Sequence, residues 1–440
     1  MKILKNIATF LLLIIIYNLL LYSICLFPSE LVYDNCLKSA KQMQAEGGFT
    51  NTITPLTNFD NYTDILIINE SYSIDNTDPL ESYLKVRKNY NKEYTKVVLP
   101  DKNGELRAYF DDKYDENGNP LNSDYDTILE CLNFLDKKVS ISVEYARYYH
   151  GYLVLYRPLL ILFDIIGIRI ITFIIFLVLF IMLGYELKKK FNLTITIIYL
   201  LALFSFDYFL IPFSMQVTPV FLIMMITLII MLKYIDNISF STLCFSAMIV
   251  GSLTCYFDYF TVPTITLTIP LFTYVYYLVK NKKYDYKELF INVLKVCIVW
   301  SLGYALTWAS KWIITDLLLG TSIIQSALEQ AFYRGLNTPI VEKDAYLVFV
   351  KHFAFVGTII ILFIIIKDSL NNKLSDDLSF NNKHVLTFIS LIPIAWSIIT
   401  FQHFIRHSIF TFRQYLVVAI YFTILLVDIL KPKIKKIKKH

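Results

Sequence analysis

Long apolar runs recur from one end of the chain to the other, separated by short polar stretches. Most runs approach the roughly 20 residues that a helix needs to cross the ~30 Å hydrocarbon core of a bilayer. The pattern predicts membrane spans at residues 7–27, 158–183, 192–207, 217–233, 238–255, 263–280, 288–309, 345–366, 385–401 and 414–430. Composition agrees, since 56% of the residues are hydrophobic and only 18% are charged. The sequence therefore predicts an α-helical polytopic membrane protein with about ten transmembrane helices.

One polar stretch, residues 28–157, is much longer than the others. It contains short apolar pieces that resemble strands, at Ile65–Ile68 and Lys96–Leu99, with Asn-Gly turn signals farther along. Leu37–Gln44 and Tyr125–Phe134 have the apolar spacing of helices instead. We therefore expect a small α+β domain between the first and second spans.

The positions of the basic residues predict how the chain is oriented in the membrane. Short cytoplasmic loops are enriched in Lys and Arg. With a cytoplasmic N-terminus, every strongly basic short loop falls on the cytoplasmic side: Lys188–Lys190, Lys233, Lys280–Lys283, Lys367–Lys383 and the C-terminal lysines. We therefore expect a multi-pass plasma-membrane protein with both termini cytoplasmic and an extracytoplasmic small domain.

These patterns divide the chain into four parts. Residues 1–27 form an N-terminal signal-anchor helix, because their apolar run is longer than that of a signal peptide and no small-x-small cleavage site follows. Residues 28–157 form the extracytoplasmic domain and residues 158–430 the transmembrane helical bundle. Residues 431–440 form a basic cytoplasmic tail.

Charge and cysteine usage exclude several classes of function. The net charge of +5 comes from loop and tail lysines, which does not indicate nucleic-acid binding. The inner loops lack a GxxxxGK[ST] phosphate loop, so an ATP-driven machine is not predicted. The six cysteines show no metal-ligand spacing. Cys36 and Cys131 lie in the polar segment, where they either form one disulfide or stay as separate thiols.

Two acidic residues, Asp60 and Asp64, precede the apolar piece Ile65–Ile68. Carboxylates in this position could act as a general base, bind a hydroxyl group or hold a divalent cation. The structural alternative is an Asx-turn with a helix N-cap. Both interpretations fit the sequence.

Cationic and aromatic residues gather at the outer ends of the predicted spans. Arginine and histidine there suit an anionic lipid head group, although interfacial anchoring explains the aromatic residues equally well. His403 and His407 are four residues apart, and the neighbouring arginines favour an anion over a metal ion. An amphipathic interfacial helix is expected at Ile323–Phe332. The candidate anion-binding residues are Arg147, His150, Arg157, Lys311, Arg334, His403, Arg406, His407 and Arg413.

Two charges, Asp164 and Arg169, lie inside the second predicted span. Such charges either pair inside the protein or line a proton or ion path. The repeated pattern F-D-Y-F around Asp207 and Asp258 either ends two helices or places two acids in one outer cavity.

The order of a short inner N-terminus, one span, an outer domain and then many spans resembles the GT-C class of membrane glycosyltransferases. The stretches Tyr62–Asp64, Arg147–Pro158, Ser310–Trp312 and His403–Arg413 also resemble a Gram-positive bacterial membrane protein group without an assigned reaction. The GT-C resemblance implies sugar transfer from a polyprenyl-phosphate donor to an envelope glycan or lipid acceptor on the outer face. It also implies an acidic pair soon after the first span, whereas Glu30 and Asp34 are not adjacent here.

On this hypothesis Asp64 is the first candidate for the catalytic base and Asp60 the second, and the outer cations hold the donor phosphate. The expected partners are membrane lipid and the polyprenyl-phosphate-linked sugar, and the sequence identifies no cofactor. The alternatives are a transporter or flippase for a lipid-linked or anionic solute, which would use Asp164 and Arg169, and an envelope-assembly scaffold.

Overall fold

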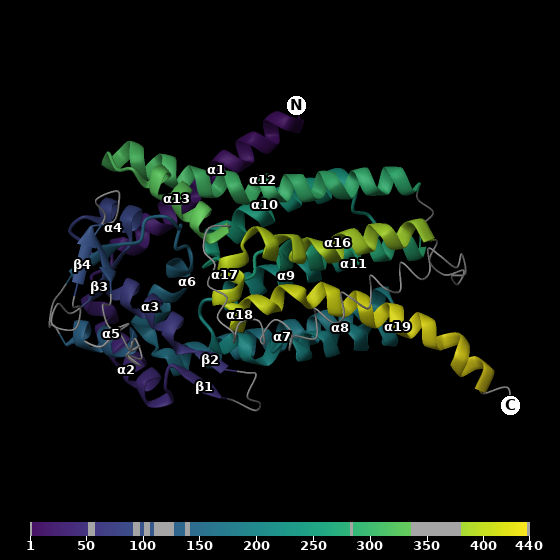
Figure 1. Ribbon diagram of the computed structural model, residues 1–440, viewed down its shortest axis with the longest axis horizontal. Coiled ribbons are helices and arrows are strands. Elements are labelled where there is room, and N and C mark those ends of the chain that lie inside the picture. The colour runs from purple at the N-terminus through teal and green to yellow at the C-terminus, as the bar shows by residue number, and fades with distance from the viewer. Residues whose placement is uncertain are drawn as a thin grey trace, which may run out of the picture.

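The computed structural model shows a mostly helical protein in which a helical bundle carries a small mixed domain at one end. Figure 1 shows the bundle helices running side by side, with the strands and short helices of the small domain gathered beyond one end of them. The structure describes residues 2–51, 58–90, 97–100, 106–109, 127–136, 141–281, 285–335 and 380–437.

Helices occupy most of each predicted span that the structure describes, and the span predicted at 345–366 lies outside the described residues. The bundle helices are α1 (Lys2–Cys25), α7 (Ile165–Lys190), α8 (Leu193–Ser205), α9 (Thr218–Tyr234), α10 (Phe240–Phe257), α11 (Ile265–Asn281), α12 (Tyr286–Leu319), α16 (Phe380–Ile399) and α19 (Leu416–Ile437). Shorter elements at the end near the small domain are η1 (Tyr208–Phe213), α13 (Ile323–Gly335), α17 (Phe401–Arg406), α18 (Ser408–Thr411) and η2 (Phe412–Tyr415). The helix predicted at Ile323–Phe332 is therefore confirmed as α13.

Length and composition identify a membrane protein but do not support the predicted count of ten spans. Within the described ranges, five helical segments are long and apolar enough to cross a bilayer: Leu4–Cys25, Ile165–Lys190, Phe240–Phe257, Tyr286–Leu319 and Ile409–Asp428. Other predicted spans are shorter helices; α8, with 13 residues, covers only about 20 Å. The length of each apolar run overestimated the length of the helix, because an apolar run does not show where a helix ends.

The second predicted span, at 158–183, also begins in the wrong place. The chain forms a separate short helix, α6 (Tyr152–Leu162), before α7 begins. Asp164 separates the two helices, because its carboxylate accepts a hydrogen bond from the Gly167 N–H at 3.0 Å and caps α7.

In the part of the small domain that the structure describes, four helices pack with three two-stranded sheets. Its helices are α2 (Glu30–Glu46), α3 (Asn61–Tyr72), α4 (Pro79–Lys85) and α5 (Thr127–Leu135). Its antiparallel pairs are β1 (Phe49–Asn51) with β2 (Asn58–Asp60), β3 (Arg87–Tyr90) with β6 (Ile141–Glu144), and β4 (Val97–Pro100) with β5 (Leu106–Tyr109). The mixed composition and the helix at 37–44 are confirmed, as are the helix predicted at 125–134 and the strand predicted at 96–99 over their described residues, 127–134 and 97–99. The strand predicted at Ile65–Ile68 is wrong, because this piece lies inside α3.

Helix α3 lies at the centre of the small domain, packed between α2 and α5. Both its apolar and its polar residues are buried, including Ile65, Ile68, Asp64 and Glu70. A helix that is buried on all sides needs hydrogen-bonding partners for every polar side chain. Those partners come from both parts of the protein: Asp64 bonds to the segment before α9, whereas Asn69 bonds to β3 of the domain. Helix α3 is therefore an element through which the domain and the bundle meet.

Long-range polar contacts fix the small domain on the bundle. Arg157 of α6 donates to the backbone carbonyls of Ser71, at 3.0 Å, and Phe27, at 2.8 Å. Near the C-terminal end of α12, Lys311 Nζ donates to the carbonyls of Tyr83, at 2.9 Å, and Leu84, at 2.8 Å. Both cations thus hold chain segments that end helices of the small domain or lead into it.

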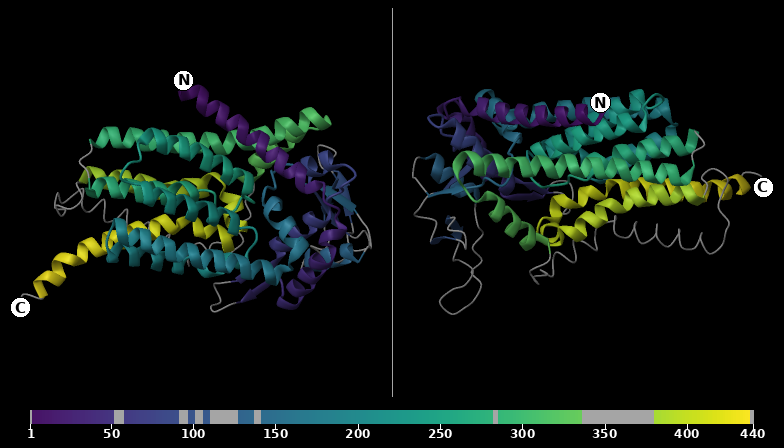
Figure 2. Two further views of the ribbon diagram at one scale, coloured as in Figure 1. Left: turned by 180° about the vertical axis from the view of Figure 1, so that it is seen from behind. Right: turned by 90° about the horizontal axis from the view of Figure 1, so that it is seen from above.

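The first helix is joined to a helix far along the chain. Tyr17 of α1 contacts the hydroxyl of Ser252 of α10 at 3.2 Å, and its ring stacks on that of Tyr256 at 4.1 Å. Figure 2 shows α1 running obliquely across the other helices toward the small domain. The anchor helix is therefore part of the bundle and not a separate tether.

Helices α10 and α12 approach each other so closely that their backbones are in contact. A Cβ atom at Gly251 would lie 2.2 Å from the Trp300 carbonyl oxygen, and one at Gly303 would lie 2.3 Å from that of Met248. Small residues permit this distance between membrane helices. The pair forms a rigid wall along one side of the bundle.

Candidate functional site

The predicted acid Asp60 caps α3 and also reaches the bundle. Its carboxylate accepts hydrogen bonds from the Thr63 N–H at 3.0 Å and the Thr63 hydroxyl at 2.7 Å, so the N-cap interpretation is confirmed. It also accepts from Gln216 Nε2 at 2.8 Å, in the segment that joins η1 to α9. Burial raises the pKa of Asp60, although the hydrogen bonds from Thr63 and Gln216 oppose the shift.

Asp64 lies one turn later on α3 and is almost completely buried. Its two oxygens accept the backbone N–H groups of Met215, at 3.0 Å, and Gln216, at 3.2 Å. Burial raises the pKa of Asp64 to about 7, against the opposing effects of the Met215 N–H and of Arg169. A carboxyl group with this pKa is half ionised near neutral pH, which suits a general base.

Arg413 of η2 approaches the same place from the C-terminal part of the chain. Its Nη2 lies 3.2 Å from the carboxylate of Asp207, and it is near enough to Asp60 for their charges to interact. Among the described residues, Arg413 Nε, Gln216 Oε1 and Ser214 Oγ are buried without a hydrogen-bond partner. The structure thus brings the predicted Asp60, Asp64 and Arg413 together. We call this group the Asp64 site: Asp60, Asp64, Asp207, Ser214, Gln216 and Arg413.

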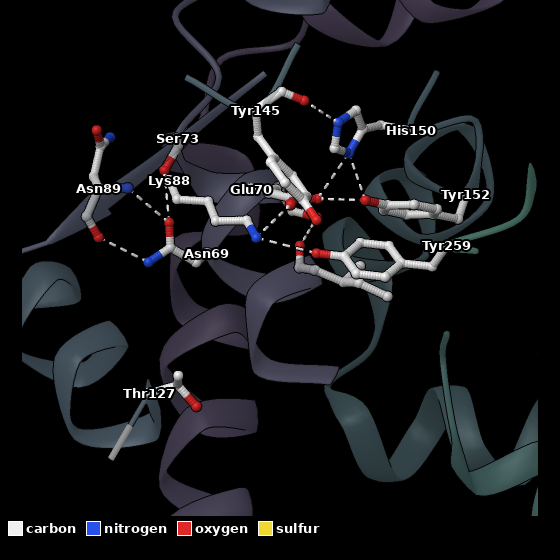
Figure 3. A network of polar contacts seen from close by, with 12 residues as sticks. Asn69, Glu70, Ser73, Lys88, Asn89, Thr127, Tyr145, His150, Tyr152 and Tyr259 are labelled. Carbon is white, nitrogen blue, oxygen red and sulfur yellow. Dashed lines mark hydrogen bonds and ion pairs between the residues drawn. The ribbon is translucent and has the colours of Figure 1, made fainter. Parts of the chain in front are cut away.

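A second polar group surrounds Glu70, farther along α3. Figure 3 shows side chains converging on its buried carboxylate from the bundle and from β3. The Tyr152 hydroxyl donates to Oε2 at 2.7 Å, His150 Nδ1 lies 3.3 Å from the same oxygen, and Lys88 Nζ lies 3.6 Å from Oε1. Burial alone would raise the pKa of Glu70, but His150 and Lys88 outweigh it and the pKa is lowered.

Lys88 and His150, next to Glu70, are themselves held in place. Lys88 Nζ donates to the Tyr259 hydroxyl at 3.1 Å and lies 3.7 Å from the ring centre of Tyr145. His150 Nε2 lies 2.7 Å from the Tyr145 carbonyl oxygen, which can only accept, so this nitrogen carries a proton. His150 has a φ of 58°, a left-handed conformation that an L-residue adopts only when its surroundings require it. We call this group the Glu70 site: Glu70, Lys88, Tyr145, His150, Tyr152 and Tyr259.

Sequence reasoning singled out His150 but missed Glu70, Lys88 and Gln216 as site residues. These partners are far apart along the chain; Glu70 and Tyr152 are separated by 82 residues, and Asp64 and Met215 by 151. No local motif records such distances. The available signal was the charge of Glu70 next to the apolar piece at Ile65–Ile68.

The other predicted cations have varied surroundings. Arg157 and Lys311 contact backbone carbonyls, so the structure gives them a structural role, and their binding of phosphate stays a prediction. Arg147 Nη1 donates to Ser326 Oγ at 3.1 Å. The side chains of Arg334, in α13, and Arg406, in α17, lie outside the described part of the structure.

The rings of His403, in α17, and His407 lie side by side, with their centres 4.6 Å apart. His403 Nε2 lies 2.7 Å from the Phe260 carbonyl oxygen, and His407 precedes α18. Within the described ranges, no group of three or more His, Cys, Asp or Glu residues is arranged to hold a metal ion. The anion-binding role of the pair stays a prediction.

The charges in the second predicted span lie where the bundle meets the small domain. Arg169 contacts both oxygens of Glu46, at 2.8 and 2.9 Å, and donates to Asn61 Oδ1 at 2.8 Å. Asp207 pairs with Arg413, whereas Asp258 accepts from the Thr261 N–H at 2.7 Å. The two F-D-Y-F acids therefore have different partners.

Cys36 of α2 and Cys131 of α5 are free and buried, so the structure shows separate thiols. Burial raises the pKa of Cys36 to about 12, which disfavours the reactive thiolate.

Comparison of the chain with protein-family models, with curated proteins and with solved structures gives no match. A proposed function therefore rests on two features of the chain itself. These are the apolar helices, which suit a membrane, and the Asp64 site at one end of them.

Proposed function

We propose that this chain is a GT-C-like membrane glycosyltransferase that moves a sugar from a polyprenyl-phosphate donor to an envelope glycan or lipid acceptor. One observation carries the proposal. An acidic pair at the start of α3 lies against Met215 and Gln216, in the segment that joins η1 to α9, and Asp60 is within electrostatic reach of Arg413. A donor with a lipid tail and a phosphate requires such a site, with a base and a cation at the membrane surface.

Asp64 acts as the base in this mechanism, with Asp60 as the alternative. It accepts the proton of the acceptor hydroxyl while the hydroxyl oxygen forms a bond to the anomeric carbon of the donor sugar. The bond between that carbon and the phosphate oxygen breaks, and the polyprenyl phosphate leaves with the bonding electrons. The pKa of about 7 allows Asp64 to take up this proton near neutral pH.

Arg413 supplies the positive charge that the leaving phosphate needs. Its guanidinium already pairs with Asp207, and its Nε has no hydrogen-bond partner among the described residues. Ser214 Oγ, which is equally buried and unpartnered in that part of the chain, adds a donor for a phosphate oxygen. Gln216 orients Asp60 from the same segment.

The topology predicted from the sequence completes the proposal. A cytoplasmic N-terminus in the plasma membrane, which the basic loops favour, would place the small domain that follows α1, and with it the Asp64 site, on the outer face. The pairing of Arg169 with Glu46 gives that charge a structural partner, so a transport path does not have to be invoked.

The test is the composition of envelope glycans and lipid-linked sugars in a host strain that lacks the gene. The strain is complemented with wild type, Asp64→Asn or Asp75→Asn, at equal protein abundance. Asp75 is a matched control, because it is an exposed carboxylate of the same domain that bonds locally to Thr77. We expect one glycan to disappear, and wild type and Asp75→Asn alone to restore it.

Two outcomes contradict the proposal. If deletion changes no glycan and no lipid-linked sugar, the chain is not a glycosyltransferase of this kind. If Asp64→Asn and Asp60→Asn restore the glycan as well as wild type does, the Asp64 site is not the catalytic site.

A further inference from the structure

A stripe of exposed apolar side chains runs along one face of α12, with members four or seven residues apart. Its members are Ile298, Leu302, Leu306, Ile313 and Leu317. The exposed residue that precedes the stripe on this face is Lys295. From its first member to its last, the stripe is about 28 Å long at 1.5 Å per residue, which matches the ~30 Å hydrocarbon core of a bilayer. The stripe therefore has the length of a complete lipid-facing surface.

This stripe continues past the end of the neighbouring helix α10. Lys295 is close enough to Cys244 of α10 to interact electrostatically, and farther along both helices Ser252 contacts the Thr307 hydroxyl at 2.7 Å. The two helices thus run in the same direction. Helix α10 ends five residues after Ser252, whereas α12 continues for twelve residues after Thr307. Helix α12 therefore extends about 10 Å beyond α10, alongside the small domain (Figure 1).

Helix α7 presents an apolar surface of the same length. Its exposed apolar side chains begin at Ile166 and end at Tyr185, and the exposed Lys188 and Lys189 follow. Ile166 and Tyr185 are again separated by about 28 Å. A hydrocarbon core that starts at the lysine end of α7 therefore reaches Ile166, at the start of the helix.

Both apolar surfaces end where the bundle joins the small domain. Asn35 of α2 donates to the Leu160 carbonyl of α6 at 2.9 Å, and the Ile165 N–H of α7 donates to Ser39 of α2 at 2.8 Å. Large apolar side chains are exposed where α1 leads into α2, where α6 leads into α7 and where α12 ends; Leu162 is 69% exposed and Leu317 79%. We call this group the apolar collar: Leu26, Phe27, Leu31, Leu162, Leu317 and Leu318.

We propose that acyl chains of the leaflet on the side of the small domain cover the apolar collar, so that the base of this domain is sunk in the membrane. The surfaces of α7 and α12 that face lipid lead directly into the collar, and this continuity identifies lipid as its partner. Exposed apolar groups of this kind are typical of membrane contacts. The position of the membrane does not depend on the proposed glycosyltransferase activity.

The Asp64 site then lies below the surface of the hydrocarbon core. Thr172 of α7 donates to the Pro212 carbonyl at 2.7 Å, three residues before Met215, whose N–H bonds to Asp64. Thr172 follows Ile166 by six residues, or about 9 Å. A substrate with a lipid tail reaches a site at this depth by diffusion within the leaflet, a consequence that rests on the proposed function.

Spin labels along α12 test the position of the membrane. The full-length protein in phosphatidylcholine vesicles carries one added cysteine at a time, labelled with a nitroxide: Ile298→Cys, Leu306→Cys, Leu317→Cys, Leu162→Cys or Leu129→Cys. The native cysteines are buried or half-buried, and protein without an added cysteine gives their background signal. Electron paramagnetic resonance measures relaxation by oxygen, which concentrates in hydrocarbon, and by a water-soluble nickel complex.

We expect the oxygen-to-nickel ratio to be highest at Leu306→Cys, near the middle of the stripe, and to be lower and similar at Ile298→Cys and Leu317→Cys. Leu162→Cys matches Leu317→Cys. Both exceed Leu129→Cys by about fivefold or more, because hydrocarbon excludes a hydrated nickel complex. Leu129 is the matched control, since it is an exposed apolar residue on α5 of the same domain.

Equal ratios at Leu162→Cys, Leu317→Cys and Leu129→Cys place the collar in water and overturn the proposal. A maximum at Ile298→Cys overturns it as well, because the membrane then ends level with α10. If both reagents are excluded from the collar and its labels broaden one another as the protein-to-lipid ratio rises, a second copy of the chain covers the collar and the lipid assignment is wrong. No sugar is involved, so these outcomes are separate from the glycan test of Asp64→Asn.

Discussion

The carboxyl group of Asp64 is buried in the folded protein, and burial disfavours its ionised form. Its pKa rises from 3.8 to about 7 on folding. For a carboxyl group with a raised pKa, the stabilising contribution is complete below the unfolded value and disappears as the pH rises through the folded value. The folded protein therefore loses part of its stability between about pH 4 and pH 7 through this one residue.

The variant Asp64→Asn removes this dependence on pH. We expect the wild type to lose on the order of 4 kcal/mol relative to Asp64→Asn between pH 4 and pH 8, from roughly three pKa units. Thermal unfolding of both proteins in detergent across this range measures the difference, with Asp75→Asn as the control. A difference that stays constant across the range would show that Asp64 does not titrate in the folded protein.

At the scale of elements, the contact between α10 and α12 depends on two glycines. The variants Gly251→Ala and Gly303→Ala each place a methyl group within 2.3 Å of a backbone carbonyl oxygen. A backbone carbonyl cannot move aside as the end of a flexible side chain can. We therefore expect each change to destabilise the protein by about 1–3 kcal/mol. Thermal unfolding in detergent tests this, with Gly184→Ala as the control, because its Cβ would lie 3.4 Å from a flexible leucine side chain. Equal melting of all three variants would contradict this account of the contact.

Element type was predictable where the apolar pattern was long and unreliable where it was short. The apolar runs at 158–183 and 238–255 fall largely within the helices α7 and α10, because a long apolar stretch in a membrane has few alternatives. Ile65–Ile68 was expected to be a strand, because four apolar residues fit either structure. Asp60, which caps α3, and the burial of α3 on all sides decided in favour of the helix. The sequence could not show this burial.

At the scale of the whole molecule, the Glu70 site joins the small domain to the bundle. We expect Glu70→Gln to destabilise the protein by about 3–5 kcal/mol, because it leaves Lys88 buried without its carboxylate. Glu70→Gln combined with Lys88→Met is less damaging than Glu70→Gln alone, since the second change removes the unpaired charge.

Thermal unfolding in detergent measures these effects. Glu81→Gln is the control, because Glu81 forms an ion pair with Lys85 on the surface, where such pairs contribute about 0–1 kcal/mol. If Glu70→Gln shifts the midpoint no more than Glu81→Gln does, the site contributes nothing to the junction.

The candidate sites, like the short helices, could be predicted only in part from the sequence. Asp60, Asp64, His150 and Arg413 were found because charged and aromatic residues are conspicuous between apolar runs. Gln216 and other partners were not, since an ordinary glutamine or a backbone N–H carries no signal until the fold places it next to Asp64. Spans shorter than a bilayer were overcounted, because hydropathy records composition and not helix ends.

The contact of Tyr17 with Ser252 affects when the protein can assemble during its synthesis. The two residues are 235 positions apart, and Lys311 follows its partner Tyr83 by 228. A ribosome that adds about 5–20 residues per second needs roughly 12–47 s to cover the first distance. During that interval α1 has no α10 to pack against, and the small domain lacks the helices that will hold it in place. Assembly of this protein is therefore ordered by translation, and its earliest segments wait for partners that are synthesised much later.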